Sequence, residues 1–348
     1  MSPYILSAFL LSLGLGTTIT FASSHWLLAW MGIEMGTLAI LPLMAQHHHP
    51  RAVEATTKYF LTQATAAAVL LFASTTNAWI TGQWDIQQMS HPLPTTMATI
   101  ALALKVGLAP LHTWLPEVMQ GLDLTTGLIL STWQKLAPFA LIVQLQPANS
   151  TIMVLLGLTS VMVGGWGGLN QTHLRKILAY SSIAHLGWMM LVLQYSPSLT
   201  MLALLTYMTM TLSTFLVFKL TSSTTLNSLA TSWAKVPMVA AITPLVLLSL
   251  AGLPPLTGFL PKWLILHELT KQDLPLPATL AALGALLSLY FYLRLSYAMA
   301  LTMSPNTWVS TTPWRLHSLH QTMPLALSTT LTILLLPLAP ALTALLLT

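Results

Sequence analysis

The sequence predicts an all-α polytopic membrane protein, and three observations lead to this fold class. Only 5% of the 348 residues are charged while 55% are apolar, which leaves too few charges to cover the surface of a water-soluble protein of this length. The apolar residues gather into about eleven stretches of roughly 20 residues, the length that a helix needs to cross a bilayer. Only short polar segments connect these stretches, so we expect one membrane domain, residues 1–348, and no sizeable soluble domain.

The apolar stretches place a transmembrane helix in each part of the chain. We expect these helices near residues 3–22, 25–45, 58–80, 95–116, 122–145, 149–170, 174–194, 198–220, 236–268, 275–300 and 323–347. The longest polar connections are residues 46–57, 81–94, 221–235 and 301–322. The chain contains no cysteine, which excludes disulfides and cysteine-ligated iron–sulfur clusters.

One ten-residue segment occurs twice. Residues 107–116 (GLAPLHTWLP) and 252–261 (GLPPLTGFLP) are identical at six positions. Both copies lie inside apolar stretches, and Pro110, Pro254 and Pro255 stand where a membrane helix would otherwise continue. Because proline lacks a backbone donor and clashes with the preceding turn, each copy predicts a broken helix. Broken helices at matching positions of two halves are typical of transport pathways.

The repeated segment also predicts an internal symmetry. The two copies are five spans apart, an odd number, so the chain crosses the membrane in opposite directions at the two sites. We therefore expect a first inverted five-helix repeat in residues 1–146 and a second in residues 147–300, followed by a loop and a C-terminal helix in residues 301–348. Inverted repeats of this kind form many transporters.

Basic residues gather on one side of the predicted membrane domain. The connections on the side of the N-terminus carry seven basic residues, whereas the opposite side carries only Lys271. Since an excess of Lys and Arg marks the cytoplasmic or matrix-like side, we expect the N-terminus on that side and the C-terminus opposite. The seven residues are Arg51, Lys58, Arg175, Lys176, Lys219, Lys235 and Arg315.

Four ionisable residues lie well inside predicted spans: Glu34, Lys105, Lys135 and Lys262. A charge at mid-bilayer costs about 2.5–3.5 kcal/mol on insertion scales, so such residues usually have a function. The glutamate can form a structural ion pair with one lysine but not with three, so at least two lysines are neutral, hydrated or paired elsewhere. Since desolvation favours uncharged lysine, these residues can bind and release protons. Together with water at a helix break, they can form a proton relay.

Two histidines are weaker candidates for the same relay. His112 lies seven residues after Lys105, on the same face if the helix stays regular. His185 lies mid-span, at the position that the inverted repeat relates to Glu34. A structural role explains each histidine equally well.

Other polar features favour structural roles. Glu117 and Asp123 are expected to be solvated acids in the connection between two spans. Adjacent histidines at 47–49 lack the i,i+4 spacing that directs two imidazoles at one metal ion. We find no nucleotide fingerprint, haem ligand pair or nucleophile–base arrangement in the sequence. We therefore expect no metal, cofactor or redox chemistry in this chain, and no nucleic-acid surface.

Longer segments around these residues resemble the antiporter-like membrane subunits of respiratory complex I. The segments are residues 30–35 (WMGIEM), 104–117 (LKVGLAPLHTWLPE), 131–135 (STWQK), 178–187 (LAYSSIAHLG) and 250–262 (LAGLPPLTGFLPK). The resemblance covers essentially the whole chain. The length and the Thr/Leu-rich, cysteine-free composition are similar to those of the vertebrate mitochondrial members.

The resemblance implies a proton-translocating subunit of the membrane arm of NADH:ubiquinone oxidoreductase, in the mitochondrial inner membrane. FMN, iron–sulfur clusters and ubiquinone would then bind to partner subunits, and this chain would contact other membrane-arm and accessory subunits and membrane lipids. Glu34 falls on the family's buried glutamate. Lys105 and Lys262 fall on the lysines of the two broken helices, and Lys135 on the bridging lysine.

Two other functions are compatible with the same arrangement of helices. A stand-alone cation/proton antiporter would work without redox partners and would migrate as a small free species on a native gel. A non-catalytic scaffold would hold neighbouring subunits and transmit conformational change. Such a scaffold would tolerate a neutral residue of similar size at Lys135.

Overall fold

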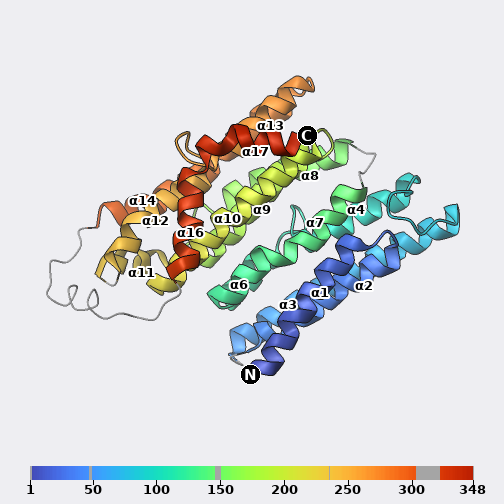
Figure 1. The fold of residues 1–348 in the computed structure, drawn as a ribbon, viewed down its shortest axis with the longest axis horizontal. Helices are drawn as coiled ribbons and strands as arrows, with labels where there is room; N and C mark the ends of the chain where they lie inside the picture. Colours follow the sequence, from blue (N-terminus) through green and yellow to red (C-terminus); the bar gives the residue numbers. More distant parts are fainter. Residues whose placement is uncertain (1, 47–48, 146–149, 235, 303–321, 348) are drawn as a thin grey trace. The chain divides into compact units, whose positions relative to one another are not determined.

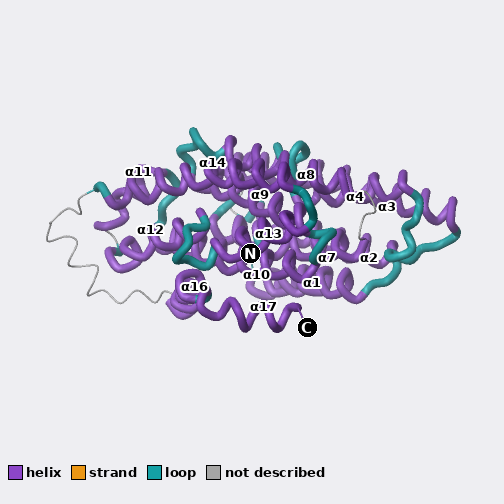
Figure 2. The backbone as a smooth tube through the Cα atoms, turned by 90° about the horizontal axis from the view of Figure 1, so that it is seen from above, coloured by secondary structure: helices purple, strands orange, loops and turns teal. Residues whose placement is uncertain are grey.

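The computed structural model describes residues 2–46, 49–145, 150–234, 236–302 and 322–347, and these residues are nearly all helical (Figure 1). Seven helices in the described ranges are long and apolar enough to cross a membrane, and three further apolar helices are shorter. Short loops join them (Figure 2). The predicted all-α membrane fold is therefore confirmed. His47, His48, Lys235 and Arg315 lie outside the described residues.

The helices form two compact units, residues 1–156 and 157–348. In the first unit α1 packs on α2, α3 packs on α2, α4 and α5, and α7 packs on α4. Glycines bring α1 and α2 close together: a Cβ at Gly16 would lie 2.6 Å from the carbonyl oxygen of Gly32, a contact typical of membrane helices. The helices of this unit are α1 (Pro3–Ala22), α2 (Trp26–Met44), α3 (Pro50–Thr81), α4 (Pro92–Val106), α5 (Trp114–Gly121), α6 (Leu124–Ser131), α7 (Trp133–Leu145) and the start of α8 (Ser150–Gly167).

In the second unit α10 packs on α9, α12, α13 and α16, and α12 also packs on α14. The elements that follow α8 are α9 (Leu174–Val192), α10 (Pro197–Thr221), α11 (Leu226–Ala230), the 3-10 helix η1 (Thr231–Ala234), α12 (Pro237–Ala251), α13 (Phe259–Lys271), α14 (Pro275–Ala300), α16 (Thr322–Leu334), the 3-10 helix η3 (Leu336–Leu338) and α17 (Ala339–Leu347).

Three predicted spans differ from the structure. Helix α3 begins at Pro50, inside the expected connection 46–57, because the Nδ1 of His49 accepts a hydrogen bond from the backbone of Arg51 (3.3 Å) and proline suits a first turn. The span expected at 122–145 is interrupted at Thr132 between α6 and α7. The span expected at 323–347 divides into α16, η3 and α17, where Pro337 and Pro340 remove backbone donors.

Both predicted helix breaks are present, but a glycine rather than a proline ends each helix. Helix α4 ends before Gly107 (φ 87°), and α12 ends before Gly252 (φ 84°). This left-handed conformation is accessible to glycine without steric strain. Pro110, Pro254 and Pro255 follow inside the non-helical segments, where they keep the helix from continuing.

Two pairs of loops meet in the way that antiparallel spans require. In the first unit an isolated antiparallel β-bridge pairs the backbones of His25 and Asp85. The ring of His25 also stacks on that of Trp84, with the ring centroids 5.4 Å apart. In the second unit a β-bridge of the same kind pairs the backbones of His173 and Thr225. Each bridge joins two connections that the alternation of spans places on one side of the membrane.

Candidate functional site

Glu34 of α2 and Lys105 of α4 form a buried ion pair in the first unit. The Nζ of Lys105 lies 3.9 Å from the Oε2 of Glu34, and the lysine side chain is 2% exposed while that of the glutamate is 23% exposed. Neither of these two atoms has a hydrogen-bond partner among the described residues. At this separation a water molecule can bridge the two groups.

Two hydrogen bonds involve the backbone of α2 around Glu34. The hydroxyl of Thr37 donates to the backbone carbonyl of Glu34 at 2.9 Å. Two residues after Glu34, the carbonyl of Gly36 accepts a hydrogen bond from the Nε2 of Gln134 at 2.8 Å, which joins α2 to α7. The helix that carries the glutamate is therefore tied, next to this residue, to the helix that carries Lys135.

Lys105 lies in the last turn of α4, where the break leaves backbone carbonyls without helical partners. The indole N–H of Trp114, the first residue of α5, donates to the carbonyl of Leu104 at 3.1 Å. The Nε2 of Gln63 in α3 lies 3.5 Å from the carbonyl of Lys105. Neutral donors from two helices thus satisfy the end of α4, and the lysine side chain is left to face Glu34.

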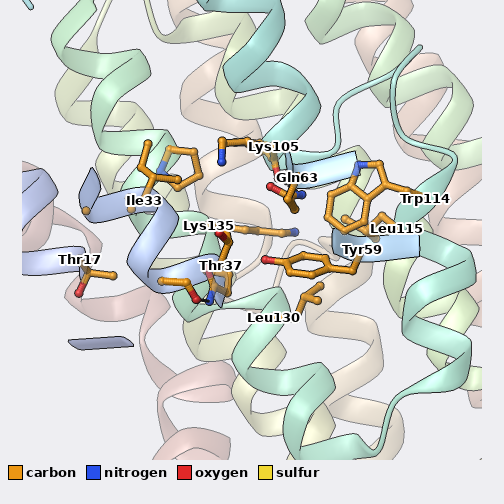
Figure 3. A pocket seen from close by; sticks show the side chains of 16 residues that line it. Thr17, Ile33, Thr37, Tyr59, Gln63, Lys105, Trp114, Leu115, Leu130 and Lys135 are labelled. Carbon is orange, nitrogen blue, oxygen red and sulfur yellow. Dashed lines mark hydrogen bonds between the residues drawn. The ribbon is translucent and has the colours of Figure 1, made fainter. Parts of the chain in front are cut away.

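A small cavity lies at this break, and Lys105 and Lys135 both line it (Figure 3). The centre of a water molecule can occupy about 20 Å³ of it, which is enough room for a water. Tyr59 and Gln63 of α3 contribute polar groups to its wall (Figure 3). The cavity is narrow and its lining is mostly apolar, but polar side chains, among them those of Tyr59, Gln63, Lys105 and Lys135, reach it and can hold a bridging water.

Lys135 is 3% exposed and lies near the start of α7. The interruption at Thr132 comes directly before this helix, and the backbone N–H of Lys135 donates to the carbonyl of Thr132 at 3.3 Å. The sequence predicted a continuous helix here. The structure therefore adds a second segment of irregular backbone next to the cavity, besides the predicted break after α4.

In the second unit, Lys262 lies in the first turn of α13 and its side chain reaches back to the second break. It is buried, and its Nζ donates to the carbonyl of Ala251 at 2.7 Å. Ala251 is the last residue of α12, whose C-terminal end carries partial negative charge. The side chain passes over Gly252, where a Cβ would lie 2.9 Å from Nζ. The backbone of the broken helix therefore serves as the partner of this lysine.

The side chain of Glu117 is 55% exposed, as the sequence predicted for a solvated acid, but it lies in a helix rather than in a loop. It belongs to α5, and its Oε2 lies 2.7 Å from the Nζ of Lys58, which is also 2.8 Å from Glu54. The loop assignment was wrong because α3 and α5 both extend into the expected connections and pack together. Asp123 precedes α6, and its backbone carbonyl accepts a hydrogen bond from Gly127 at 2.8 Å.

The two candidate histidines are not placed with the lysines of the first unit's cavity. His112 lies in the non-helical segment between α4 and α5, so the shared helix face predicted for it and Lys105 does not exist. His112 is not among the residues that line the cavity. His185 lies on α9 in the second unit, with its ring centroid 5.5 Å from that of Tyr207.

Sequence reasoning missed the neutral polar residues of the site, Tyr59, Gln63 and Gln134. Tyr59 is 2% exposed and Gln63 is 4% exposed, although both belong to a membrane-spanning helix. Their spacing of four residues places them on one face of α3. A pair of polar side chains at this spacing within an apolar span was the available signal.

The chain is similar to known proteins over nearly its whole length. Residues 23–288 match the family described as NADH:quinone oxidoreductase/Mrp antiporter, TM, and residues 289–343 match NADH dehydrogenase subunit 2 C-terminus. A protein of Gadus morhua named NADH-ubiquinone oxidoreductase chain 2 is 71% identical over 99% of both chains. The chain belongs to the NADH-ubiquinone oxidoreductase chain 2 family. Another relative with this name, from Salmo salar, is 69% identical over 99% of both chains.

Solved structures show the same fold as this member of the chain 2 family. A chain of respiratory complex I from Thermus thermophilus is 29% identical, with a TM-score of 0.84 over 98% of this chain and 81% of that chain. A chain of the Mrp complex from Dietzia sp. has a TM-score of 0.80 at 16% identity, over 97% of this chain and 75% of that chain. The resemblance to antiporter-like membrane subunits is confirmed.

Proposed function

We propose that this chain is a proton-translocating subunit of the membrane arm of respiratory NADH:ubiquinone oxidoreductase in the mitochondrial inner membrane. The observation that carries the proposal is the Glu34–Lys105 pair, whose lysine lines a water-sized cavity together with Lys135 at a broken helix. The high identity to NADH-ubiquinone oxidoreductase chain 2 relatives supports the assignment to this enzyme. FMN, iron–sulfur clusters and ubiquinone bind to other subunits, which supply the redox energy.

The first unit moves protons by a change of charge among three groups. An ionised Glu34 stabilises a proton on Lys105, because opposite charges 3.9 Å apart attract strongly in a poorly solvated site. Lys135 lines the same cavity, so two protonated lysines there repel each other. Arrival of a proton at one lysine therefore favours loss of the proton that the other lysine holds. Water in the cavity carries protons between the two lysines.

The later step of proton transfer takes place in the second unit. Lys262 exchanges its proton at the second break, where the carbonyl of Ala251 holds the ammonium when it is charged. His185, beside Tyr207, is the second proton carrier of this unit. His112 exchanges protons at the first break. The inverted repeats, residues 1–146 and 147–300, provide one broken helix each.

The N-terminus faces the matrix and the C-terminus faces the intermembrane space. The support is the excess of basic residues in the connections on the side of the N-terminus, against Lys271 alone on the opposite side. The bridges His25–Asp85 and His173–Thr225 agree with the alternation on which this orientation depends.

Lys105→Met tests the proposal in the assembled enzyme, reconstituted in vesicles, where protons moved per NADH oxidised are measured. The variant removes the titratable group and keeps most of the side-chain volume, so we expect the ratio to fall. Lys219→Met is the matched control because Lys219 is exposed at the end of α10; it should leave the ratio unchanged. An unchanged ratio in both variants would support a scaffold role instead.

A native gel of solubilised membranes separates the proposal from a stand-alone antiporter. We expect this chain to migrate only with a large NADH-oxidising assembly, because its relatives are named as chains of an oxidoreductase. Migration as a small free species with antiport activity would contradict the proposal.

A further inference from the structure

The second unit contains an apolar cavity that the proton relay does not use. The centre of a water molecule can occupy about 460 Å³ of it, a volume within the range of ligand sites. Pro254, Leu260 and Leu264 form one wall, and Ala339 of α17 forms the opposite wall. The cavity therefore lies between two helix interruptions, the one after α12 and the one after α16.

A hydrogen bond joins these two interruptions next to the cavity. The hydroxyl of Thr257, in the non-helical segment after α12, donates to the carbonyl of Thr332 at 2.6 Å. Thr332 lies in the last turn of α16, where the interruption leaves carbonyls without helical partners. The bond fixes the separation of the two walls, so the cavity is a built feature of the fold.

The lining of the cavity suits an apolar chain. Apart from the indole of Trp263, the only polar side-chain group in the lining is the hydroxyl of Thr343, which donates to the carbonyl of Pro340 at 3.0 Å. Trp263 is 56% exposed, and Pro254 and Pro340 are also exposed, so the cavity opens at the surface of the unit. In a membrane, an apolar opening of this kind is accessible to acyl chains.

One face of α13 runs from the cavity to the positively charged side chain of Lys271. Leu260, Leu264, His267 and Lys271 follow each other at intervals of four, three and four residues, which places them on one face of the helix. Trp263 stacks on His267 with the ring centroids 6.3 Å apart. The lysine side chain at the end of this face is 57% exposed and lies 3.7 Å from Glu268.

The length of this face matches half of a bilayer. Seven residues separate Leu264 from Lys271, which corresponds to about 10 Å along a helix, and the lysine side chain extends the reach. One leaflet contributes about 15 Å of the hydrocarbon core. A lipid with its phosphate at Lys271 therefore has acyl carbons at the depth of the cavity.

We propose that this cavity and the face of α13 form a phospholipid site, with one acyl chain between α13 and α17 and the phosphate at Lys271. The apolar lining selects the chain, and the exposed lysine selects an anionic headgroup. The site is independent of the proton relay, although it adjoins the first turn of α13 that carries Lys262.

Photocrosslinking in the intact respiratory complex tests the site. The complex is reconstituted in nanodiscs with phosphatidylglycerol that carries a diazirine in one acyl chain, and the crosslinked peptides are identified by mass spectrometry. We expect residues 254–264 and 336–343 to be labelled several-fold more than the exposed face of α14, which carries Leu283 and Leu286.

Two pairs of variants separate the parts of the site. Ala339→Phe fills the cavity and should abolish the excess labelling, whereas Leu338→Phe, at an exposed neighbour outside the lining, should preserve it. Lys271→Gln should lower labelling by the anionic lipid roughly fivefold, the factor that one surface lysine contributes, and Lys271→Arg should retain it. If Ala339→Phe prevents assembly, Ala339→Leu replaces it.

Three outcomes would overturn the proposal. The first is labelling of the cavity no higher than that of α14, and the second is labelling unaffected by a filled cavity. The third is a crosslink from these peptides to another protein chain, which would show that a protein segment fills the cavity. If the Lys271→Gln variant is labelled as strongly as the wild type, the placement of the phosphate at Lys271 is wrong and that part of the proposal fails.

Discussion

The three buried lysines of this chain have three different partners, and these partners decide what each lysine can do. Lys105 faces a carboxylate, Lys135 lines the small cavity beside the first break, and Lys262 donates to the backbone carbonyl of Ala251. A lysine next to a carboxylate responds to the charge of that group, whereas a lysine on a helix end responds to a fixed dipole. The residues are chemically alike but not interchangeable.

Substitution of Lys135 tests the need for proton exchange at the cavity. Lys135→Met keeps most of the volume and removes the titratable group, so assembly should survive while proton pumping and NADH:ubiquinone turnover fall. Lys135→Arg should fail as well, because a guanidinium does not release its proton in a protein. Pumping by the arginine variant at the wild-type rate would show that a fixed positive charge is sufficient there.

Substitution of Lys262 separates stability from transport. Lys262→Met leaves the buried carbonyl of Ala251 unsatisfied, at a cost of roughly 1–3 kcal/mol. Its thermal unfolding midpoint and its pumping should both fall. Lys262→Gln retains a donor but cannot exchange a proton, so the midpoint should recover in part while pumping stays low. Recovery of both properties would mean that Lys262 only caps α12.

At the scale of the element, a glycine determines where each of the two broken helices ends. Gly107 and Gly252 adopt φ values of 87° and 84°, and each ends a helix at the depth of a buried lysine. The prolines follow two or three residues later, in segments that are already non-helical. The glycines therefore set where each helix ends, and the prolines keep it from resuming early.

Because the glycines end the helices and the prolines only keep them from resuming, substitution of a glycine should impair proton transfer more than substitution of a proline. Gly107→Ala forces a left-handed conformation that costs roughly 1–2 kcal/mol, and its Cβ would lie 2.8 Å from the Cδ1 of Leu115, a wall of the cavity. Pro110→Ala and Pro255→Ala should impair proton transfer with assembly partly retained, but less than the glycine variant. Protons moved per NADH are the measurement. Wild-type coupling in all three variants would show that the breaks serve packing alone.

At the scale of the whole molecule, the distribution of basic residues predicts the orientation of the chain. A tag fused at the N-terminus should be accessible from the matrix, and one fused at the C-terminus from the intermembrane space. Protease protection in mitochondria and in mitoplasts measures both. The reverse pattern would contradict the assignment of Arg51, Lys176 and Lys219 to matrix connections.

The sequence alone determined the helical membrane fold, both breaks and the identity of the buried charges. These properties are local: about 20 apolar residues fix a span, and a glycine followed by proline ends a helix wherever it occurs. Glu34, Lys105, Lys135 and Lys262 were recognisable as candidates because a charge inside an apolar span is costly and therefore rare.

Only the tertiary structure decided which of these residues meet. The Gln134–Gly36 bond joins residues 98 positions apart, and no local pattern specifies such a pair. Close packing through small residues brings α1 and α2 together, and many arrangements of apolar helices satisfy the same hydropathy. The shared cavity of Lys105 and Lys135, the backbone partner of Lys262 and the Lys58–Glu117 ion pair follow from this packing.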